Sequence, residues 1–152
     1  MMTFEQLGLR QDLLKAVSDL GFVNPTPIQE KTLSILLQEK TDVVALAQTG
    51  TGKTAAFGLP LLSLLDTQDK RTQALILAPT RELCMQICSD LKDFSKYVKG
   101  LNVLPVYGGS AISNQINELK RGVQVVVATP GRLVDLIERR AIKLQEVDEC
   151  MD

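Results

Sequence analysis

The segment that decides the fold is Val43–Thr54, with the sequence VVALAQTGTGKT. Its first five residues, Val43–Ala47, form an apolar, Val-rich run that is too short for a helix, which predicts a buried strand. A loop rich in Gly and Thr follows over Gln48–Thr54, and helical spacing of apolar residues resumes after it. The segment therefore predicts a strand, a tight loop and a helix in succession.

This loop matches the phosphate-binding loop at each defining position except the first, where Ala47 replaces the usual Gly. Gly50 and Gly52 let the backbone curl so that successive N–H groups face an anion, and the start of the next helix adds partial positive charge. Lys53 then reaches the β- and γ-phosphates, and Thr54 is a ligand for Mg²⁺. The predicted site comprises Ala47, Gln48, Thr49, Gly50, Thr51, Gly52, Lys53 and Thr54. The plainer alternative is a Gly/Thr loop with a solvated Lys. The motif indicates a nucleoside triphosphate without choosing a reaction, because kinases, GTPases, transport ATPases and helicases share it.

Outward from the loop, helical and strand patterns alternate. Helices are predicted over residues 10–20, 26–38, 53–65, 81–99, 111–121 and 132–139, and further buried strands over 74–78, 103–107 and 123–128. This alternation predicts an α/β fold, a parallel sheet with helices on both faces. Pro105 has no backbone N–H to donate, so its strand is expected near an edge of the sheet.

Polar or Gly-rich segments follow four of the predicted strands. They are Gln48–Thr54, Pro79–Glu82, Gly108–Ser110 and Thr129–Arg132. Ligands of parallel sheets collect at the carboxyl ends of the strands. We therefore expect these four segments to form the binding edge.

The composition excludes several classes of protein. The chain has 152 residues, with 17 Lys and Arg against 18 Asp and Glu, for a net charge of −1. That balance excludes a polycationic nucleic-acid binder, so any nucleic acid would have to bind through a local patch or through backbone groups. Histidine is absent, which excludes Ser-His-Asp and Cys-His catalysis and zinc sites built on imidazole.

The chain has three cysteines, Cys84, Cys88 and Cys150. This number is small and odd, which argues against a disulfide framework and fits a reducing compartment. Cys84 and Cys88 share a face of the predicted helix, where small buried apolar residues are a better interpretation than a two-thiolate metal site. The N-terminal residues show no signal-peptide pattern, and the longest apolar runs are far short of a membrane span. The expected location is the cytoplasm.

Gln29 has two interpretations. In Thr26-x-x-Gln29 its side chain can accept a hydrogen bond from the Thr26 backbone N–H, which makes a capping box at the start of the helix. Alternatively, its amide presents a paired donor and acceptor that can meet the amino group and a ring nitrogen of adenine together and reject guanine.

Five ordered segments make the sequence similar to the DEAD-box ATP-dependent RNA helicases. Gly21–Gln29 resembles the Q motif of that family, with Phe4 seventeen residues before Gly21 as the family requires. The other resemblances follow in order: Ala47–Thr54 to motif I, Pro79–Leu83 to motif Ia, Gly108-Gly109 to the GG element and Thr129–Arg132 to motif Ib.

The resemblance implies a RecA-like P-loop fold that binds ATP, Mg²⁺ and RNA. The family's adenine role falls on Gln29 and Phe22, with Phe4 as an apolar neighbour and Asn24 as a backbone contact. Its contacts to the RNA sugar-phosphate backbone fall on Pro79, Thr80, Arg81, Gly108, Gly109, Thr129, Gly131 and Arg132. Such contacts carry no base code, so binding is expected to be independent of RNA sequence. The remaining basic candidates are interpreted as solvated helix faces; they are Lys92, Lys96, Lys99, Lys120, Arg121, Arg139 and Arg140.

The resemblance also implies an incomplete domain. Residues 1–40 correspond to the Q-motif region with its N-terminal helices, and residues 41–152 to part of a first RecA-like domain. The Asp-Glu-Ala-Asp motif is expected to begin near position 153; Asp148-Glu149-Cys150 is not interpreted as that motif. The Ser-Ala-Thr element and the second RecA-like domain are also expected to be missing, as are the later strands of the sheet. We therefore expect an incomplete Mg²⁺ site and no helicase turnover by this chain alone, an expectation that RNA-stimulated ATP hydrolysis by the chain would contradict.

Two other functions remain open from the sequence. One is another adenine-nucleotide P-loop enzyme, such as a small-molecule kinase, which would not explain Gln29 with Phe4 or the segment Thr129–Arg132. The other is a non-catalytic nucleotide- or RNA-binding module. In the leading interpretation, the full-length protein is an RNA-stimulated ATPase that unwinds short RNA duplexes.

Overall fold

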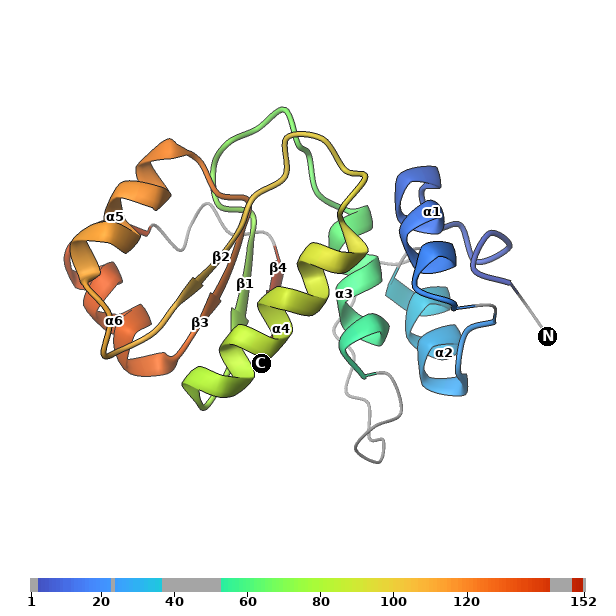
Figure 1. Ribbon diagram of the computed structural model, residues 1–152, viewed down its shortest axis with the longest axis horizontal. Helices are drawn as coiled ribbons and strands as arrows, with labels where there is room; N and C mark the ends of the chain where they lie inside the picture. Colours follow the sequence, from blue (N-terminus) through green and yellow to red (C-terminus); the bar gives the residue numbers. More distant parts are fainter. Residues whose placement is uncertain (1–2, 23, 37–52, 143–148, 152) are drawn as a thin grey trace. The chain divides into compact units, whose positions relative to one another are not determined.

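The computed structural model describes residues 3–22, 24–36, 53–142 and 149–151 (Figure 1). It divides the chain into two compact units, residues 1–64 with 93–98 and residues 65–92 with 99–152. The strand predicted over Val43–Ala47 and the loop residues Gln48–Gly52 lie outside the described residues.

The first unit contains the helices α1 (Gln11–Asp19), α2 (Pro27–Leu36) and α3 (Lys53–Ser63). The apolar stripe predicted for the first helix is present, since Leu13, Ala16 and Val17 of α1 are buried. Helix α2 packs against α3, and Leu33 and Leu59 are fully buried.

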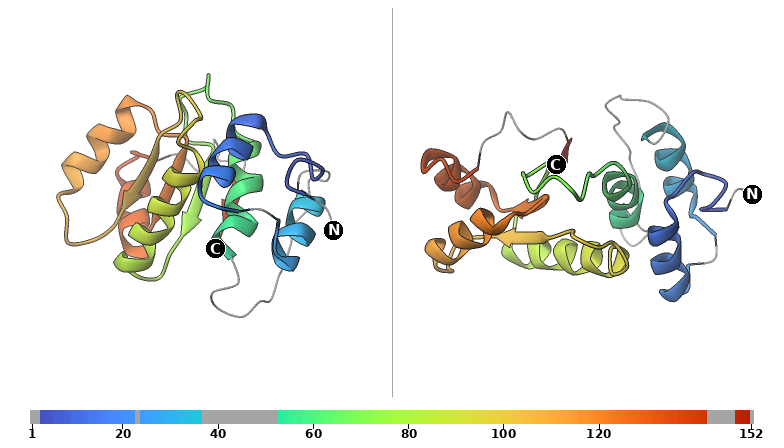
Figure 2. Two further views of the ribbon diagram at one scale, coloured as in Figure 1. Left: turned by 45° about the vertical axis from the view of Figure 1, so that its right-hand side comes forward. Right: turned by 90° about the horizontal axis from the view of Figure 1, so that it is seen from above.

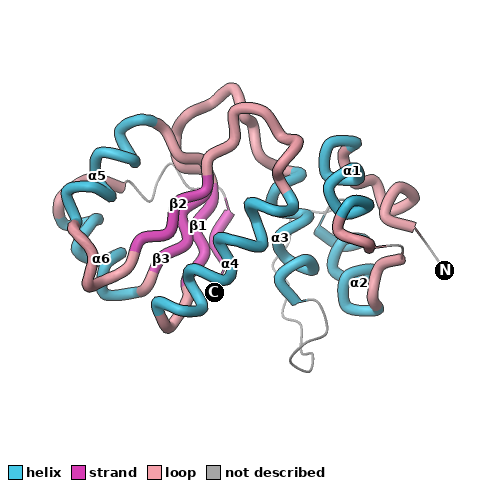
Figure 3. The backbone as a smooth tube through the Cα atoms, viewed as in Figure 1, coloured by secondary structure: helices cyan, strands magenta, loops and turns pink. Residues whose placement is uncertain are grey.

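The second unit contains a parallel sheet of four short strands, shown in magenta in Figure 3. The strands are β1 (Ala74–Leu77), β2 (Val103–Val106), β3 (Val125–Ala128) and β4 (Glu149–Met151). Their order is β2-β3-β1-β4, with parallel pairing throughout. Among the described strands β2 lies at an edge, which confirms the prediction from Pro105.

Helices cover both faces of this sheet, as predicted. Helices α5 (Ile112–Arg121) and α6 (Pro130–Glu138) pack on the face that carries Leu75, Val106 and Val126. Side chains alternate between faces along a strand, so Ile76 and Val127 belong to the other face. Helix α4 (Arg81–Phe94) runs along the sheet (Figure 2).

Two cysteine side chains of α4 contact the backbone of the strands. Cys84 and Cys88 are buried free thiols, and their Sγ atoms lie 3.0 Å from the carbonyl oxygen of Val127 and 3.8 Å from that of Val103. Burial raises the pKa of the Cys84 thiol to about 11 and also raises the pKa of Cys88. Both are therefore neutral packing residues, as the composition suggested.

Two predicted boundaries need correction. Helix α4 ends at Phe94 instead of Lys99, because the chain turns there with a hydrogen bond from Val98 N to Ser95 O. Within the first unit, the turn lets Lys96 pair with Asp19 at 3.1 Å and Tyr97 donate a hydrogen bond to the same carboxylate. Helix α6 begins two residues before Arg132, at Pro130, whose fixed φ suits the first helical position.

Strand β4 was not predicted from the sequence. This strand pairs in parallel with β1, with Glu149 opposite Ala74 and Met151 opposite Ile76. The sequence signal was weak because the strand is only three residues long. None of the helices in the described parts of the chain is long and apolar enough to cross a membrane.

Candidate functional site

Three of the predicted binding segments begin at the same edge of the sheet. Leu77 at the end of β1 pairs with Ala128 at the end of β3, which pairs in turn with Val106 at the end of β2. Hydrogen bonds continue one residue further, from Ala78 N to Ala128 O at 2.8 Å and from Thr129 N to Val106 O at 3.0 Å. The segments containing Pro79–Arg81, Gly108-Gly109 and Thr129–Arg132 therefore leave neighbouring strands at matched positions. We refer to this edge as the carboxyl edge.

Arg81 connects the first of these segments to the second. Its guanidinium lies over the ring of Tyr107, 4.7 Å from the centroid, and the side chain is otherwise exposed. Gly109 has φ +86, and a Cβ on it would lie 3.7 Å from Nη1 of Arg81. The Arg81 charge is thus positioned beside the exposed Gly108-Gly109 turn, where it can meet an anion.

Arg132 connects the third segment to the second. Its Nη1 donates to the Ser110 carbonyl oxygen at 3.1 Å and to Oε1 of Gln115 at 2.9 Å, and its Nη2 donates to the Ser110 oxygen at 3.1 Å. Gln115, which is buried, donates in turn to the Tyr107 carbonyl oxygen at 3.3 Å. In the structure the Arg132 guanidinium is hydrogen-bonded to Ser110, directly after the Gly108-Gly109 turn. Its contact with RNA stays a prediction.

Two helices begin at the carboxyl edge. Thr80 caps α4, because its Oγ1 accepts a hydrogen bond from Leu83 N at 3.2 Å. Thr129 stands at the N-cap of α6 and its side chain makes no capping hydrogen bond, while Pro130 occupies the first helical position and Gly131 is exposed. The first turn of α6 therefore presents backbone N–H groups without a side-chain cap, an arrangement that suits a phosphate.

In the first unit, the capping interpretation of Gln29 is confirmed. Oε1 of Gln29 accepts a hydrogen bond from Thr26 N at 3.0 Å, and Gln29 N donates to Oγ1 of Thr26 at 3.4 Å. The buried Gln29 side chain is therefore fixed in position by the start of α2. The adenine role of this amide stays a prediction.

The other predicted adenine residues differ in their exposure. Phe22 is 37% exposed and its ring lies 6.1 Å from that of Phe94, so one part of the ring can receive a flat partner. Asn24 is exposed as well. Phe4 is 3% exposed and packs inside the unit, which fits its predicted part as an apolar neighbour.

The phosphate loop itself lies largely outside the described residues. Its predicted helix is present, because α3 begins at Lys53 and runs for 11 residues. Thr54 is half-buried in the first turn of that helix. A helix start directly after the loop, with Thr54 in the first turn, fits a triphosphate and its metal ion.

Sequence reasoning gave no role to Tyr107 or Gln115, and it placed Ser110 in a binding segment without predicting its contact. The backbone oxygens of Tyr107 and Ser110 accept hydrogen bonds, which no side-chain pattern reveals, and the Tyr107 ring also contacts the Arg81 guanidinium. Gln115 carried a signal, since it lies on the same helical stripe as Ile112, Ile116 and Leu119. A polar residue on an apolar stripe predicts a buried hydrogen bond.

Comparisons with known proteins agree with this geometry. A family model described as DEAD/DEAH box helicase matches residues 26–150. The chain is 52% identical over 147 residues to the DEAD-box ATP-dependent RNA helicase CshA of Streptococcus pneumoniae, covering 97% of the chain and 28% of the relative. It is 49% identical over 146 residues to the ATP-dependent RNA helicase DeaD of Mycobacterium tuberculosis, covering 96% of the chain and 26% of the relative.

Solved structures give the same result. A DEAD box protein from Methanococcus jannaschii superposes with a TM-score of 0.90 at 39% identity, covering 97% of the chain and 40% of its own length. A Saccharomyces cerevisiae Dbp5 variant bound to RNA and ADP BeF3 superposes with a TM-score of 0.87 at 36% identity, covering 97% and 37%. The chain thus spans 26% and 28% of the length of these two curated relatives.

Proposed function

Because the chain belongs to the DEAD/DEAH box helicase family, we propose that it supplies the ATP- and RNA-binding part of an ATP-dependent RNA helicase. The observation that carries the proposal is the carboxyl edge, where three segments leave β1, β2 and β3 at matched positions. Arg81 and Arg132 interlock those segments around the Gly108-Gly109 turn.

The RNA contacts in this proposal run along the sugar-phosphate backbone. The donors are the Arg81 guanidinium, the N–H groups of the Gly108-Gly109 turn and the first turn of α6 at Gly131. Thr80 and Thr129 add hydroxyl groups, and Pro79 shapes the approach to α4. None of these groups reads a base, so RNA of any sequence is expected to bind.

ATP is proposed to bind in the first unit. Lys53 and the loop before it would hold the phosphates, and Thr54 would be a ligand of a bound Mg²⁺, which neutralises phosphate charge in such sites. Phe22 would pack against adenine and the Gln29 amide would hydrogen-bond its edge, with Asn24 nearby. In the full-length protein, a second RecA-like domain would complete the hydrolytic site and enable unwinding of short duplexes. The unpaired thiols of Cys84 and Cys88 support a reducing compartment such as the cytoplasm.

RNA binding by the carboxyl edge is tested with a labelled single-stranded RNA of about eight nucleotides, within the range of a single site. Arg81→Ala should weaken binding about fivefold at 0.1 M salt, the contribution of one phosphate contact by counterion release. Arg139→Ala is the matched control, since Arg139 is exposed at the C-cap of α6, outside the carboxyl edge. Fluorescence anisotropy measures both; equal affinity for the two variants would refute the assignment.

Adenine recognition needs a variant that separates it from helix capping. Gln29→Glu keeps an oxygen for the Thr26 N–H but removes the amide donors. We expect it to leave α2 folded and to abolish the preference for ATP over GTP, measured with fluorescent nucleotides. Equal binding of ATP and GTP by the unsubstituted chain would favour a different class of P-loop enzyme.

A further inference from the structure

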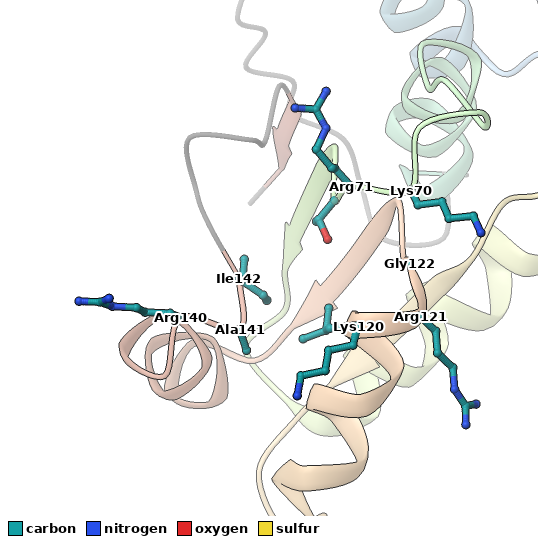
Figure 4. A pocket seen from close by; sticks show the side chains of 10 residues that line it. Lys70, Arg71, Lys120, Arg121, Gly122, Arg140, Ala141 and Ile142 are labelled. Carbon is teal, nitrogen blue, oxygen red and sulfur yellow. The ribbon is translucent and has the colours of Figure 1, made fainter.

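A basic hollow lies at the amino edge of the sheet in the second unit, at the other end of the strands from the carboxyl edge (Figure 4). Its volume is about 320 Å³. Lys70–Thr72 before β1, Leu119–Gly122 at the end of α5 and Arg140–Ile142 after α6 line it. Of its ten lining residues five are basic and none is acidic. We call it the amino-edge hollow.

The frame of the hollow is tightly packed. Gly122 has φ +107, and a Cβ on it would lie only 2.9 Å from Cβ of Lys70, so the two segments can meet only at a glycine. Thr72 Oγ1 donates to the Val123 carbonyl oxygen at 2.9 Å. Ile142 belongs to the hydrophobic core of this unit, and the half-buried Leu119 packs against that core. The backbone segments that carry the basic side chains are therefore held in place by packing and hydrogen bonding.

The charge of the hollow exceeds what its surroundings neutralise. Arg71 pairs with Asp69 at 2.7 Å and Arg121 with Glu118 at 3.1 Å. The other three cations, which are Lys70, Lys120 and Arg140, form no ion pair with any residue in the described part of the chain. The carboxyl ends of α5 and α6 contribute roughly half a negative charge each. Counted over the described side chains, a net positive charge of about two remains.

The charged groups spread around the rim. Figure 4 shows Lys70, Lys120 and Arg140 extending in different directions from the hollow. Arg140 has φ 58, a left-handed conformation that favours Gly or Asn, so a long basic side chain occupies a position where a small residue would cost less. A compact anion needs donors that converge on it, whereas spaced cations match successive phosphates along a strand.

We propose that the amino-edge hollow is a second RNA-binding surface, which holds the phosphate backbone of RNA that extends beyond the segment at the carboxyl edge. This inference rests on the proposed function, because it assumes that the chain binds RNA at all. It reverses our interpretation of Lys120, Arg121 and Arg140 as merely solvated, and it adds Lys70 and Arg71. Binding here would again be independent of sequence and sensitive to salt.

The test compares two single-stranded RNAs, one of about eight nucleotides and one of about forty, which exceeds a single site several times over. Lys70, Lys120 and Arg140 are replaced together by Ala. We expect the affinity for the long RNA to fall about a hundredfold at 0.1 M salt, since three phosphate contacts are removed and each contributes about fivefold. The salt dependence should become shallower by about two, at roughly 0.7 per contact on single strands. The affinity for the short RNA should stay unchanged.

Controls separate this inference from the proposed function. Replacing Lys31, Lys92 and Lys99, which are exposed elsewhere, removes the same charge and should leave the long-RNA affinity nearly unchanged. Arg81→Ala should weaken both RNAs; if neither RNA binds the unsubstituted chain, the proposed function fails. If Arg81→Ala acts as expected but the two triple variants are equivalent on the long RNA, only the amino-edge proposal fails. A further competition experiment uses tripolyphosphate, matched to the long RNA in total phosphate groups. If tripolyphosphate displaces the long RNA at that concentration, the hollow is a site for a compact anion, and the amino-edge proposal is overturned.

Discussion

Replacing Arg132 by Ala should destabilise the protein and thereby loosen the Gly108-Gly109 turn. The guanidinium donates to two acceptors, the Ser110 carbonyl oxygen and Oε1 of Gln115, over distances of 2.9 to 3.1 Å. Hydrogen bonds from a charged donor contribute about 1.5–3 kcal/mol each. Arg132 is only half-buried, so we take the lower end and expect a loss of about 2–3 kcal/mol.

Part of this loss in the free energy of unfolding comes from Gln115, which loses its hydrogen-bond donor. Gln115 is 6% exposed, so its Oε1 would be nearly cut off from water when Arg132 is removed. A double-mutant cycle of Arg132→Ala and Gln115→Ala isolates that interaction, and we expect a coupling free energy of about 1 kcal/mol. Arg132→Lys should recover only part of the loss, because an ammonium cannot reach both acceptors as the planar guanidinium does.

The assays are urea unfolding, which gives the free energy of unfolding, and thermal unfolding, which gives Tm. Both are followed by circular dichroism, since the chain has no Trp. A loss of about 2.5 kcal/mol corresponds to a fall of roughly 5–10 °C in Tm for a domain of this size. Arg139→Ala is the control, because its exposed ion pair with Asp135 should contribute about 0.5 kcal/mol or less. A coupling energy near zero, with RNA affinity lost at unchanged stability, would refute the positioning role and return Arg132 to direct RNA contact.

Three further predictions follow from the second unit. Gly122→Ala should cost about 1–3 kcal/mol, because φ is +107 and the new Cβ would lie 2.9 Å from Cβ of Lys70. Gly122→Asn introduces the same Cβ and should lose a similar amount in thermal unfolding; unchanged stability of both variants would contradict the close approach. The Arg71 guanidinium lowers the pKa of Asp69 to about 2 from 3.8, so this carboxylate stabilises the fold above about pH 4 and loses that effect as the pH falls toward 2. Asp69→Asn should therefore flatten the dependence of stability on pH in that window, and an unchanged slope in acid titration would contradict the pairing. Cys84, whose thiol pKa is raised to about 11 by burial, should resist iodoacetamide at pH 8 until urea unfolds the protein; rapid labelling of the folded chain would show the thiol to be accessible.

The sequence by itself determined the class of fold and predicted which segments follow the strands at the carboxyl edge. Apolar runs and helical stripes depend only on spacing along the chain, so β1, β2, β3 and most helix boundaries were predicted within a few residues. The edge position of Pro105 followed from its missing N–H. The resemblance to DEAD-box helicases rests on the same local motifs. It named Arg81 and Gly109 as RNA contacts but did not predict that the two residues lie side by side.

Only the tertiary structure decided which residues cooperate. The Arg132 guanidinium meets Gln115 and Ser110 because β2 and β3 are neighbours in register, a pairing between segments that no local pattern encodes. Spacing in the sequence did not relate Arg140 to Lys70, because β1, α4, β2, α5, β3 and α6 all lie between them in the chain. Parallel strands return every βα unit to the same edge, so residues before β1, after α5 and after α6 gather at one end of the sheet. Charge that looked scattered along the chain becomes a single basic surface for that reason.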